Sequence, residues 1–533
     1  MTLSQDWWRG ATIYQIYPRS FADSNGDGIG DLPGITAHLD HVASLGVDAI
    51  WISPFYTSPM ADFGYDVADY CDVDPIFGTL ADFDALVARA HALGLKVMID
   101  MVFAHTSDAH AWFAQSRASR DNDKADWYVW RDAHADGTPP NNWQSVFGGP
   151  AWTWDARRQQ YYMHQFLSSQ PQLNAHNPAV REACLDALRF WLARGVDGFR
   201  LDALNHAMFD PDFADNPPAP DTGKPRTRPY DFQLKTNSMN HPNVVGFVEA
   251  IAAVCRQAGA IFTVAEIGGD ESDPLMKAYT AGDTRLNSAY SFDFLYAEAL
   301  TPALVAKTQG AWTGELDSQG RSEGWPSWAF ENHDAPRHVS RWVEEAHRPA
   351  FARMTMALLL ALRGNAFLYQ GQELGLTQDD IPFHLLKDPE AIANWPLTLS
   401  RDGVRTPMPW VAGADHGGFT QGEPWLPLSP ANRTRAVDVQ GEDEESQLNY
   451  TRRLIALRRA HPALLTGAME DLRAEGNLLS FTRREEGQAL HCAFNLGVQP
   501  LAHHAPEGEV LLAINSADAQ RLPAYGAILV RMA

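Results

Sequence analysis

The amino-acid sequence predicts an α/β fold: a closed (β/α)8 barrel of the TIM-barrel type, with a subdomain inserted after its third strand and an all-β C-terminal domain. Two observations predict the barrel. An amphipathic helix, a glycine and a short apolar strand follow one another repeatedly, and strands that alternate with helices form parallel sheets. The strand-like segments also number eight, which closes such a barrel. They are residues 12–17, 49–53, 96–102, 198–203, 261–267, 290–295, 327–332 and 366–370.

The segments between these strands have helical periodicity. Between Phe83 and Ala90, apolar residues recur at positions i, i+3, i+4 and i+7, and Asp82 is the predicted N-cap. Pro178 is expected in the first turn of a later helix, where proline is tolerated. A glycine such as Gly94 ends each repeat and suits the left-handed position after a helix.

Two regions interrupt this pattern and set the domain boundaries. Residues 105–175 are rich in Trp, Gly and Pro and contain a hairpin-like run, so we predict that they form the inserted subdomain (domain B). Beyond residue 457, strand-like segments replace the helical pattern and indicate a β-sandwich over 458–533. The barrel then comprises 1–104 and 176–457, with a long loop over its mouth near 205–240, because loops of such length are often lids or binding walls.

Composition excludes several classes of partner. The 533 residues contain 42 Lys and Arg against 66 Asp and Glu, a net charge of −24. Such a surface repels phosphate, so we expect no nucleic-acid partner. No apolar run reaches the roughly 18 residues of a membrane span. The N-terminus lacks an apolar signal segment and the four cysteines are sparse, so we expect reduced thiols and a cytoplasmic location.

Ionisable residues stand at the ends of several predicted strands. Arg200 and Asp202 share one face of the fourth strand, Glu266 ends the fifth, and Asp334 follows the seventh. The carboxyl ends of barrel strands converge on one site, and isolated buried charges are costly. A carboxylate-lined pocket is therefore favoured over separate salt bridges. Two carboxylates that flank a bond are the apparatus of glycoside hydrolysis; a metal-dependent hydrolase is disfavoured because no tight pair of metal ligands occurs.

Several motifs resemble those of the α-amylase family of glycoside hydrolases (family 13), over nearly the whole chain. Within that family the chain is similar to the exo-acting α-glucosidase and oligo-1,6-glucosidase branch. The family motifs are 100–105 (DMVFAH), 198–202 (GFRLD), 264–266 (VAE) and 332–334 (NHD), and those typical of the branch are 7–10, 13–21, 61–66 and 401–410.

The resemblance implies a role for each matching residue. Asp202 would be the nucleophile, Glu266 the general acid and base, and Asp334 the carboxylate that grips sugar hydroxyls. Arg200 would keep Asp202 ionised, and burial would raise the pKa of Glu266. Glu249 is a rival acid, but it lies in a helix-like run. The other residues expected around the terminal glucose are Asp62, Tyr65, His105, Phe147, Phe166, His333 and Arg401.

The loop from Asp23 to Asp31 has the appearance of a cation site. Oxygen-bearing residues alternate along it and Gly28 stands at the turn, as in calcium loops, but the bidentate glutamate of an EF-hand is missing. An empty polar turn is the alternative. The resemblance implies one structural Ca²⁺ or Mg²⁺ and no organic cofactor. The implied ligands are Asp23, Asn25, Asp27, the carbonyl of Ile29 and Asp31.

The substrate expected from the sequence is a short α-glucoside. Residue 203, beside the implied nucleophile, is alanine; in the resembling enzymes valine at this position accompanies α-1,6 linkages and smaller residues accompany α-1,4 linkages. We therefore expect a retaining exo-α-glucosidase acting on maltose-like sugars or sucrose, as a monomer or homodimer. A transglucosylase or a sucrose or maltose isomerase is the alternative. A non-catalytic scaffold is disfavoured because all three carboxylates are present.

Overall fold

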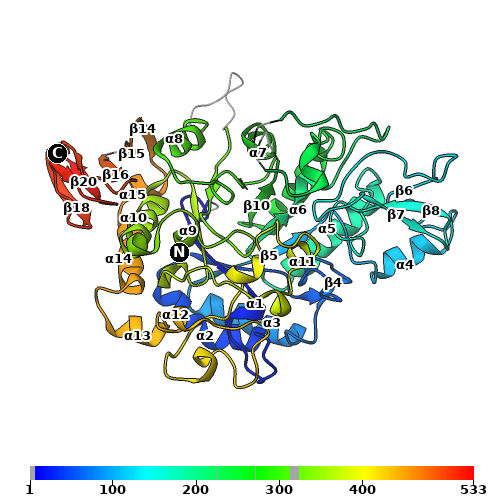
Figure 1. Cartoon of the computed structure of the whole chain (residues 1–533), viewed down its shortest axis with the longest axis horizontal. Coiled ribbons are helices and arrows are strands. Elements are labelled where there is room, and N and C mark those ends of the chain that lie inside the picture. The colour runs from blue at the N-terminus through cyan, green and yellow to red at the C-terminus, as the bar shows by residue number, and fades with distance from the viewer. Residues whose placement is uncertain (1–5, 222, 224, 270–271, 313–322, 486) are drawn as a thin grey trace.

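Eight parallel strands form the centre of the molecule (Figure 1). They are β1 (Thr12–Ile16), β2 (Ala49–Ile52), β5 (Lys96–Val102), β9 (Gly198–Asp202), β10 (Phe262–Ile267), β11 (Ser288–Ser291), β12 (Ser327–Trp328) and β13 (Asn365–Tyr369). Their order is β11-β10-β9-β5-β2-β1-β13-β12, and a parallel bridge between Ala289 and Pro326 joins the two ends into the predicted barrel. The computed structural model describes residues 6–221, 223, 225–269, 272–312, 323–485 and 487–533.

All eight predicted strands are present, but the bounds of two were wrong. The sixth was expected over 290–295 and lies at Ser288–Ser291, because the chain turns after it, with the backbone N–H of Tyr296 donating to the carbonyl of Phe292. The seventh was expected over 327–332 and ends at Trp328. In both cases apolar residues beyond the strand are buried in the core, in a turn after the sixth strand and in an irregular segment after the seventh. A pattern of hydrophobicity cannot distinguish such residues from a strand.

Helices surround the barrel. They are α1 (Pro18–Phe21), α2 (Leu32–Ser44), α3 (Leu80–Ala92), α5 (Pro178–Leu192), α6 (Val244–Ala258), α7 (Ser272–Thr280), α8 (Pro302–Gly310), α9 (His338–Arg341), α10 (Arg348–Ala361), α11 (Pro389–Ala393), α12 (Pro430–Arg433), α13 (Val437–Glu442), α14 (Gln447–Ala460) and α15 (Pro462–Leu465). Among the described residues, none of the helices is both long and apolar enough to cross a membrane.

The local signals for helix ends were read correctly except at α3. Its N-cap is Thr79 rather than Asp82, which stands at the third helical position and accepts a hydrogen bond from the backbone N–H of Thr79 at 2.9 Å. Threonine followed three residues later by an acid forms a reciprocal capping box, so the acid supports the cap and does not form it. Pro178 opens α5 as predicted, and Gly94 is left-handed with φ +80°.

Side chains alternate between two layers along β9. Phe199 and Leu201 are fully buried in the core between the strands and the helices. Arg200 points into the barrel, where it meets Asp100 of β5, and Asp202 lies on the same face. The alternation of the strand therefore places the charged pair toward the carboxyl end of the barrel interior.

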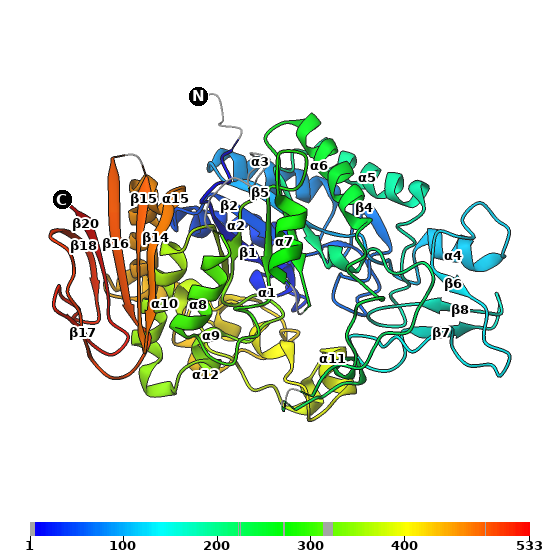
Figure 2. The same ribbon diagram turned by 90° about the horizontal axis from the view of Figure 1, so that it is seen from above.

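The segment between β5 and α5 projects from one end of the molecule (Figure 2). It holds α4 (Ala111–Ala118) and a three-stranded antiparallel sheet of β6 (Trp130–Arg131), β8 (Gln160–Met163) and β7 (Trp152–Asp155). The pair β7 and β8 is the hairpin that the sequence indicated. An antiparallel bridge between His105 and Gln172 ties the two ends of the segment together.

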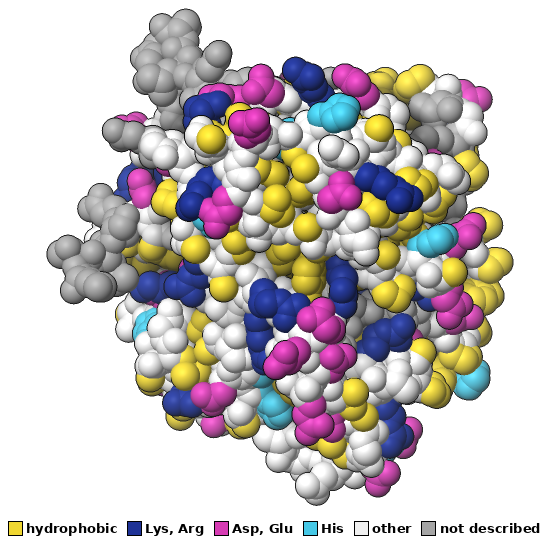
Figure 3. Space-filling view, turned by 90° about the vertical axis from the view of Figure 1, so that its left-hand side faces the viewer, with side chains coloured by type: hydrophobic (Ala, Val, Ile, Leu, Met, Phe, Trp, Pro, Cys, Tyr) yellow, Lys and Arg dark blue, Asp and Glu magenta, His cyan; other side chains and the backbone are white. Residues whose placement is uncertain are grey.

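The C-terminal strands form a separate layer at the opposite end (Figures 1 and 2). A five-stranded antiparallel sheet has the order β14-β15-β16-β20-β18, and β17 pairs with β19. Figure 3 looks onto this end, where acidic and basic side chains are interspersed with apolar ones. Strand β14 was not predicted, because this edge strand is largely exposed and polar. The strands are β14 (Ala468–Glu475), β15 (Leu478–Glu485), β16 (Gln488–Asn495), β17 (Leu501–Ala502), β18 (Gly508–Ile514), β19 (Arg521–Leu522) and β20 (Ala527–Met532).

Candidate active site

A cavity of about 650 Å³ opens at the carboxyl ends of the barrel strands, the end at which barrel enzymes carry their sites. Asp202 at the end of β9, Glu266 near the end of β10 and Asp334 after β12 all line it. Of the residues expected around a glucose, Arg200 and His333 are fully buried behind the wall instead of lining it. Those that do line it are Asp62, Tyr65, His105, Phe147, Phe166 and Arg401.

Arg200 connects the ionisable groups at the bottom of this cavity. Its Nη1 donates to Asp100 Oδ1 and to Asp202 Oδ1, both at 2.6 Å. Its Nη2 donates to Glu266, and its Nε donates to the hydroxyl of Tyr290 at 3.0 Å. One guanidinium therefore fixes Asp202 and Glu266 relative to each other, with a fork geometry that a lysine cannot reproduce.

Burial dominates the ionisation of the two carboxyl groups. It raises the pKa of Asp202 to about 7, although Arg200 lowers that pKa. Arg200 therefore acts on Asp202 in the expected direction, by favouring its ionised form, but desolvation outweighs the attraction of the guanidinium. Burial likewise raises the pKa of Glu266 to about 7. Arg200 lowers this pKa, and repulsion from Asp202 raises it further. The raised pKa of Glu266 agrees with the prediction.

Asp334 has the opposite ionisation. Burial favours its neutral form, but the charges of His333, when that ring is protonated, and of Arg405 and Arg401 outweigh burial and hold the pKa of Asp334 well below the usual range. Burial also lowers the pKa of His333 to about 3, and its Nδ1 accepts a hydrogen bond from Gln15 Nε2 at 2.8 Å. Since His333 is then neutral at pH 7, the charge that keeps Asp334 ionised comes from Arg405 and Arg401, at 2.6 and 3.3 Å from Oδ1.

Further ion pairs close the inner end of the cavity. Arg401, in a 3-10 turn over Arg401–Val404, donates through Nη2 to Asp62 at 3.0 Å and to Asp388 at 2.7 Å. Burial raises the pKa of Asp62 to about 6, although Arg401 lowers it. The Tyr65 hydroxyl lies 2.6 Å from His333 Nε2, and the two rings stack at 5.3 Å. This end of the cavity is a dense array of hydroxyl, carboxylate and guanidinium groups.

Aromatic rings supply the other wall. The rings of His105 and Phe166 lie 5.0 Å apart, and those of Phe147 and Phe166 lie 5.9 Å apart. His105 Nε2 is 3.1 Å from the carbonyl of Tyr65, while its buried Nδ1 has no hydrogen-bond partner in the described part of the chain. Apolar faces therefore lie beside a polar end, as the binding of an amphipathic ring such as a sugar requires.

Three residues of this site were not assigned a role from the sequence. Asp100 and Arg405 stand inside motifs that were recognised, but their direction depends on the barrel geometry. Tyr290, which donates to Glu266 at 3.0 Å, is the third residue of β11, the strand whose bounds were misplaced. Glu249, the rival acid, lies on α6, pairs with Arg285 at 3.6 Å and does not line the cavity.

The predicted cation loop is held by hydrogen bonds of its own. Asp23 accepts from the backbone N–H groups of Asn25, Gly26 and Gly28. Asp31 caps α2 by accepting from the N–H of Gly34 at 2.6 Å. Over the described ranges, no group of three or more His, Cys, Asp or Glu residues is placed to hold a metal ion. A cation here would therefore depend on the amide and carbonyl oxygens of the predicted set as much as on its carboxylates, and the site stays a prediction.

Comparisons with known proteins agree with this geometry. The model of the alpha-amylase catalytic domain matches residues 15–467. A probable alpha-glucosidase of Rhizobium meliloti (strain 1021) is 49% identical over 549 residues, which cover 99% of this chain and 98% of the relative. The structure of the alpha-glucosyl transfer enzyme XgtA has a TM-score of 0.93 and 49% identity and covers 99% of both chains. The trehalulose synthase MutB from Pseudomonas mesoacidophila MX-45 has a TM-score of 0.88 and 33% identity, covering 98% of this chain and 99% of that one. The chain belongs to the alpha-amylase family, glycoside hydrolase family 13.

Proposed function

We propose that the protein is a retaining exo-α-glucosidase that releases glucose from the non-reducing end of short α-glucosides. The observation that carries the proposal is the binding of Asp202 and Glu266 to neighbouring nitrogens of the Arg200 guanidinium. Carboxyl groups held so close favour the retaining mechanism, which uses a separation of about 5 Å, over the inverting one, which needs room for a water molecule.

The proposed reaction has two displacements. Asp202 attacks the anomeric carbon while Glu266 gives its proton to the leaving oxygen, so the glycosidic bond breaks and a β-glucosyl ester forms on Asp202. Water then attacks the same carbon, Glu266 takes the proton of that water, and the ester bond breaks. Two inversions release α-glucose and return both groups to their starting state.

The inner end of the cavity supports an exo mode of action. The guanidinium of Arg401 is bonded to Asp62 and Asp334 at this end of the cavity, and we expect this group to stop a sugar chain from continuing past the terminal glucose. The cavity lining also carries more carboxylates than cations. This excess favours a neutral sugar over an anionic one.

The linkage and the acceptor are the finer parts of the proposal. Ala203 lines the cavity beside Asp202, and we infer from its small side chain a preference for α-1,4 linkages and sucrose. Transfer of the glucosyl group to a second sugar is the alternative, supported by the likeness to XgtA and MutB, which are named for glucosyl transfer and trehalulose synthesis. We further propose a cytoplasmic location, supported by four unpaired cysteines.

A proton NMR time course with maltose, sucrose and isomaltose in parallel tests this function. Early α-glucose from maltose or sucrose, with isomaltose intact, is the expected result. Early β-glucose would contradict the retaining mechanism. Transfer products in excess of free glucose would favour the transglucosylase, and cleavage of isomaltose alone would overturn the linkage preference.

We expect a bell-shaped dependence of kcat/KM on pH, with its maximum near neutrality. The active form holds one proton on the pair, with Asp202 ionised and Glu266 protonated, and burial raises both pKa values to about 7. The Tyr290 hydroxyl partly offsets burial by lowering the pKa of Glu266. Tyr290→Phe should therefore move the alkaline limb up by about one pH unit, the equivalent of a hydrogen bond to a charged group.

The matched control for this pH profile is Tyr279→Phe. The Tyr279 hydroxyl is buried on α7 and has no hydrogen-bond partner among the described residues, so its loss should leave both limbs in place. An alkaline limb that moves down or stays fixed in Tyr290→Phe would contradict the assignment of Glu266 as the acid that Tyr290 positions.

We also propose that the loop from Asp23 to Asp31 binds one Ca²⁺ or Mg²⁺ through Asp23, Asn25, Asp27, the Ile29 carbonyl and Asp31. The alternation of oxygen-bearing residues and the left-handed Gly28, with φ +88°, support this. Chelation with EDTA should lower Tm by about 5 °C, and Ca²⁺ or Mg²⁺ should restore it, because a bound cation stabilises only the folded state. The response should be lost in Asp27→Asn, and an unchanged Tm in the parent protein would exclude the site.

A further inference from the structure

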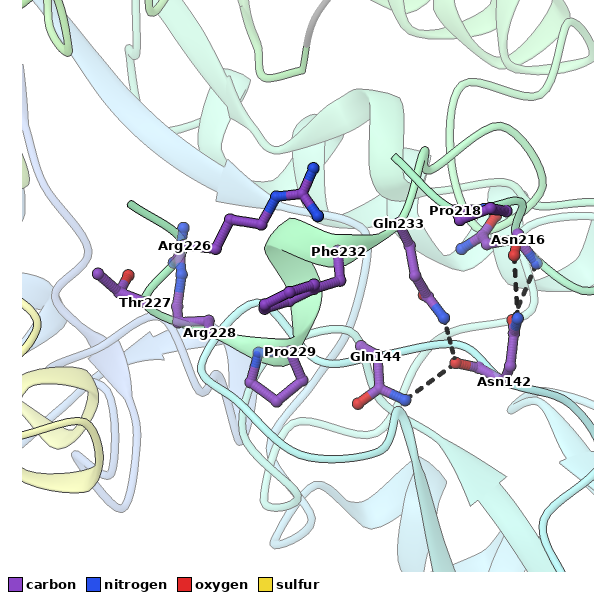
Figure 4. A pocket seen from close by; sticks show the side chains of 10 residues that line it. All are labelled: Asn142, Gln144, Asn216, Pro218, Arg226, Thr227, Arg228, Pro229, Phe232 and Gln233. Atoms are coloured by element: carbon purple, nitrogen blue, oxygen red, sulfur yellow. Dashed lines mark hydrogen bonds between the residues drawn. The ribbon is translucent and has the colours of Figure 1, made fainter. Parts of the chain in front are cut away.

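Figure 4 shows the lining of a second cavity, of about 590 Å³, which adjoins the catalytic one. Two segments far apart in the sequence build it, the inserted segment around Asn142 and the long segment that follows β9. Thr227 and Arg228 line both cavities, so the two share a wall. We call it the amide pocket. Its lining residues are Asn142, Gln144, Asn216, Pro218, Arg226, Thr227, Arg228, Pro229, Phe232 and Gln233.

The floor of the amide pocket is fixed by hydrogen bonds between the two segments. Asn142 Nδ2 donates to the carbonyl of Asn216, and the backbone N–H of Asn216 donates back to Asn142 Oδ1, both at 2.9 Å. The side chain of Asn216 is itself buried and bonded to Ser238 at 3.0 Å. Because both asparagines are engaged, the floor is formed before any ligand arrives.

Two glutamines stand side by side on this floor. Gln144 Nε2 and Gln233 Nε2 both donate to the carbonyl of Asn142, at 2.9 and 2.7 Å (Figure 4). Within the described ranges the structure records no donor for the Oε1 atom of either glutamine. Each amide also keeps a second hydrogen. The pocket therefore presents two fixed amides, each with an acceptor and a donor to offer.

An aromatic ring completes the lining. Phe232 ends a short 3-10 turn (Pro229–Phe232) and is 52% exposed. The guanidinium of Arg226 lies 4.9 Å from the ring centre and bonds to the carbonyl of Ala219 at 3.2 Å. A phenyl ring with half its surface open inside a polar pocket is a place where an amphipathic ligand replaces water.

Both arginines of the lining are already engaged by protein groups, so the amides remain the main polar groups open to a ligand. None of the ten lining residues is an Asp or Glu. The charge of Arg228 is balanced by Glu390 at 2.7 Å and Asp231 at 3.2 Å, and the guanidinium of Arg226 is engaged with backbone carbonyl oxygens. Amides that donate and accept, beside an open aromatic face, match the hydroxyl pairs and the C–H face of a sugar ring.

We propose that the amide pocket is a second carbohydrate-binding site, which holds a neutral mono- or disaccharide beside the catalytic cavity. Its position, behind the wall formed by Thr227 and Arg228, suits a sugar that waits next to the site as an acceptor. The binding itself does not depend on the proposed function, since no residue of the pair Asp202 and Glu266 belongs to the pocket.

Equilibrium dialysis with [¹⁴C]maltose counts the sites. The Asp202→Asn protein, which cannot turn maltose over, should bind two molecules per chain, and adding Phe232→Ala should weaken one site by about tenfold. Trp154→Ala is the matched control: this residue of β7 is 46% exposed and lies outside the pocket, so both sites should persist. In the background with Asp202 intact, Phe232→Ala should leave kcat/KM for maltose at low concentration unchanged.

The outcomes separate this inference from the proposed function. One site that Phe232→Ala abolishes would keep the amide pocket and count against maltose binding in the catalytic cavity. The inference would be overturned if neither Phe232→Ala nor Gln233→Ala changed the number of maltose sites or their affinity, whether that number is one or two. Inorganic phosphate that binds the pocket where maltose does not would also overturn it, since that would mark the pocket as an anion site built on Arg226. If Phe232→Ala does not fold, Gln233→Ala takes its place and should likewise weaken one of the two maltose sites.

Discussion

Replacing Asp202 by asparagine is expected to lower kcat/KM for maltose by about 10⁴-fold or more, a loss typical of removing a nucleophile. The amide keeps the shape of the side chain and a place beside Arg200, but it cannot attack the anomeric carbon. Glucose release from maltose, followed by a coupled assay over a wide range of enzyme concentration, measures the loss. Asp212→Asn, at an exposed position of the same segment, is the control and should be nearly neutral.

The same variant should be more stable than the parent protein at pH 8. Burial raises the folded pKa of Asp202 to about 7, above its unfolded value of about 3.9. The folded state therefore binds the proton more tightly than the unfolded state does. Protonation of Asp202 contributes its full amount to the free energy of unfolding below pH 4, and this contribution is lost as the pH rises through 7. Each pH unit between the two pKa values is worth about 1.4 kcal/mol. Asparagine, which is neutral throughout, avoids this loss.

Urea denaturation of both proteins at pH 4 and pH 8 measures that effect. The free energy of unfolding should differ little at pH 4, where the parent carboxyl group is protonated when folded, and should favour Asp202→Asn at pH 8. Retained activity within tenfold of the parent protein would place the nucleophile elsewhere. Loss of activity with a stability that falls at pH 8 would show that the ion pair with Arg200 outweighs burial and keeps Asp202 ionised in the folded state.

The strand ends could be predicted because parallel strands of a barrel bring their carboxyl ends together whatever lies between them. Asp202, Glu266 and Asp334 are far apart in the sequence, and each follows a recognisable strand signal. To predict that these three residues converge, only the correct order of the strands is needed. The same reasoning correctly set aside Glu249, because its neighbours have helical periodicity.

Features that depend on side-chain direction or on irregular segments could not be predicted. Whether burial or Arg200 controls the pKa of Asp202 depends on how much water reaches it, which no motif encodes. Tyr290 meets Glu266 because the register of β10 and β11 pairs the two residues, and the sequence does not fix that register. The amide pocket joins Gln144 to Gln233 across segments without periodicity, and the sequence contains no signal for their contact.

Replacing Arg200 by methionine should have the second large effect. Methionine fills similar space but leaves Asp100, Asp202 and Glu266 buried without the cation that binds all three. Removing one partner of a buried ion pair costs about 3–5 kcal/mol. The pKa of Asp202 should rise further, so little ionised nucleophile remains at pH 7 and activity should fall by about 10³-fold or more.

The loss of stability in Arg200→Met should depend on pH, because it arises from the ionisation of the buried carboxyl groups. Without Arg200 their folded pKa values lie further above the unfolded ones, so the deficit in unfolding free energy should be small near pH 4 and grow toward pH 8. Arg189→Met, which removes an exposed ion pair on α5, should cost less than about 1 kcal/mol at any pH.

Arg200→Lys restores the charge but not the fork and should recover more stability than activity, because one ammonium cannot hold Asp202 and Glu266 in their relative positions. Equal recovery of both would mean that Arg200 acts through its charge alone, and a deficit independent of pH would mean that it acts through packing.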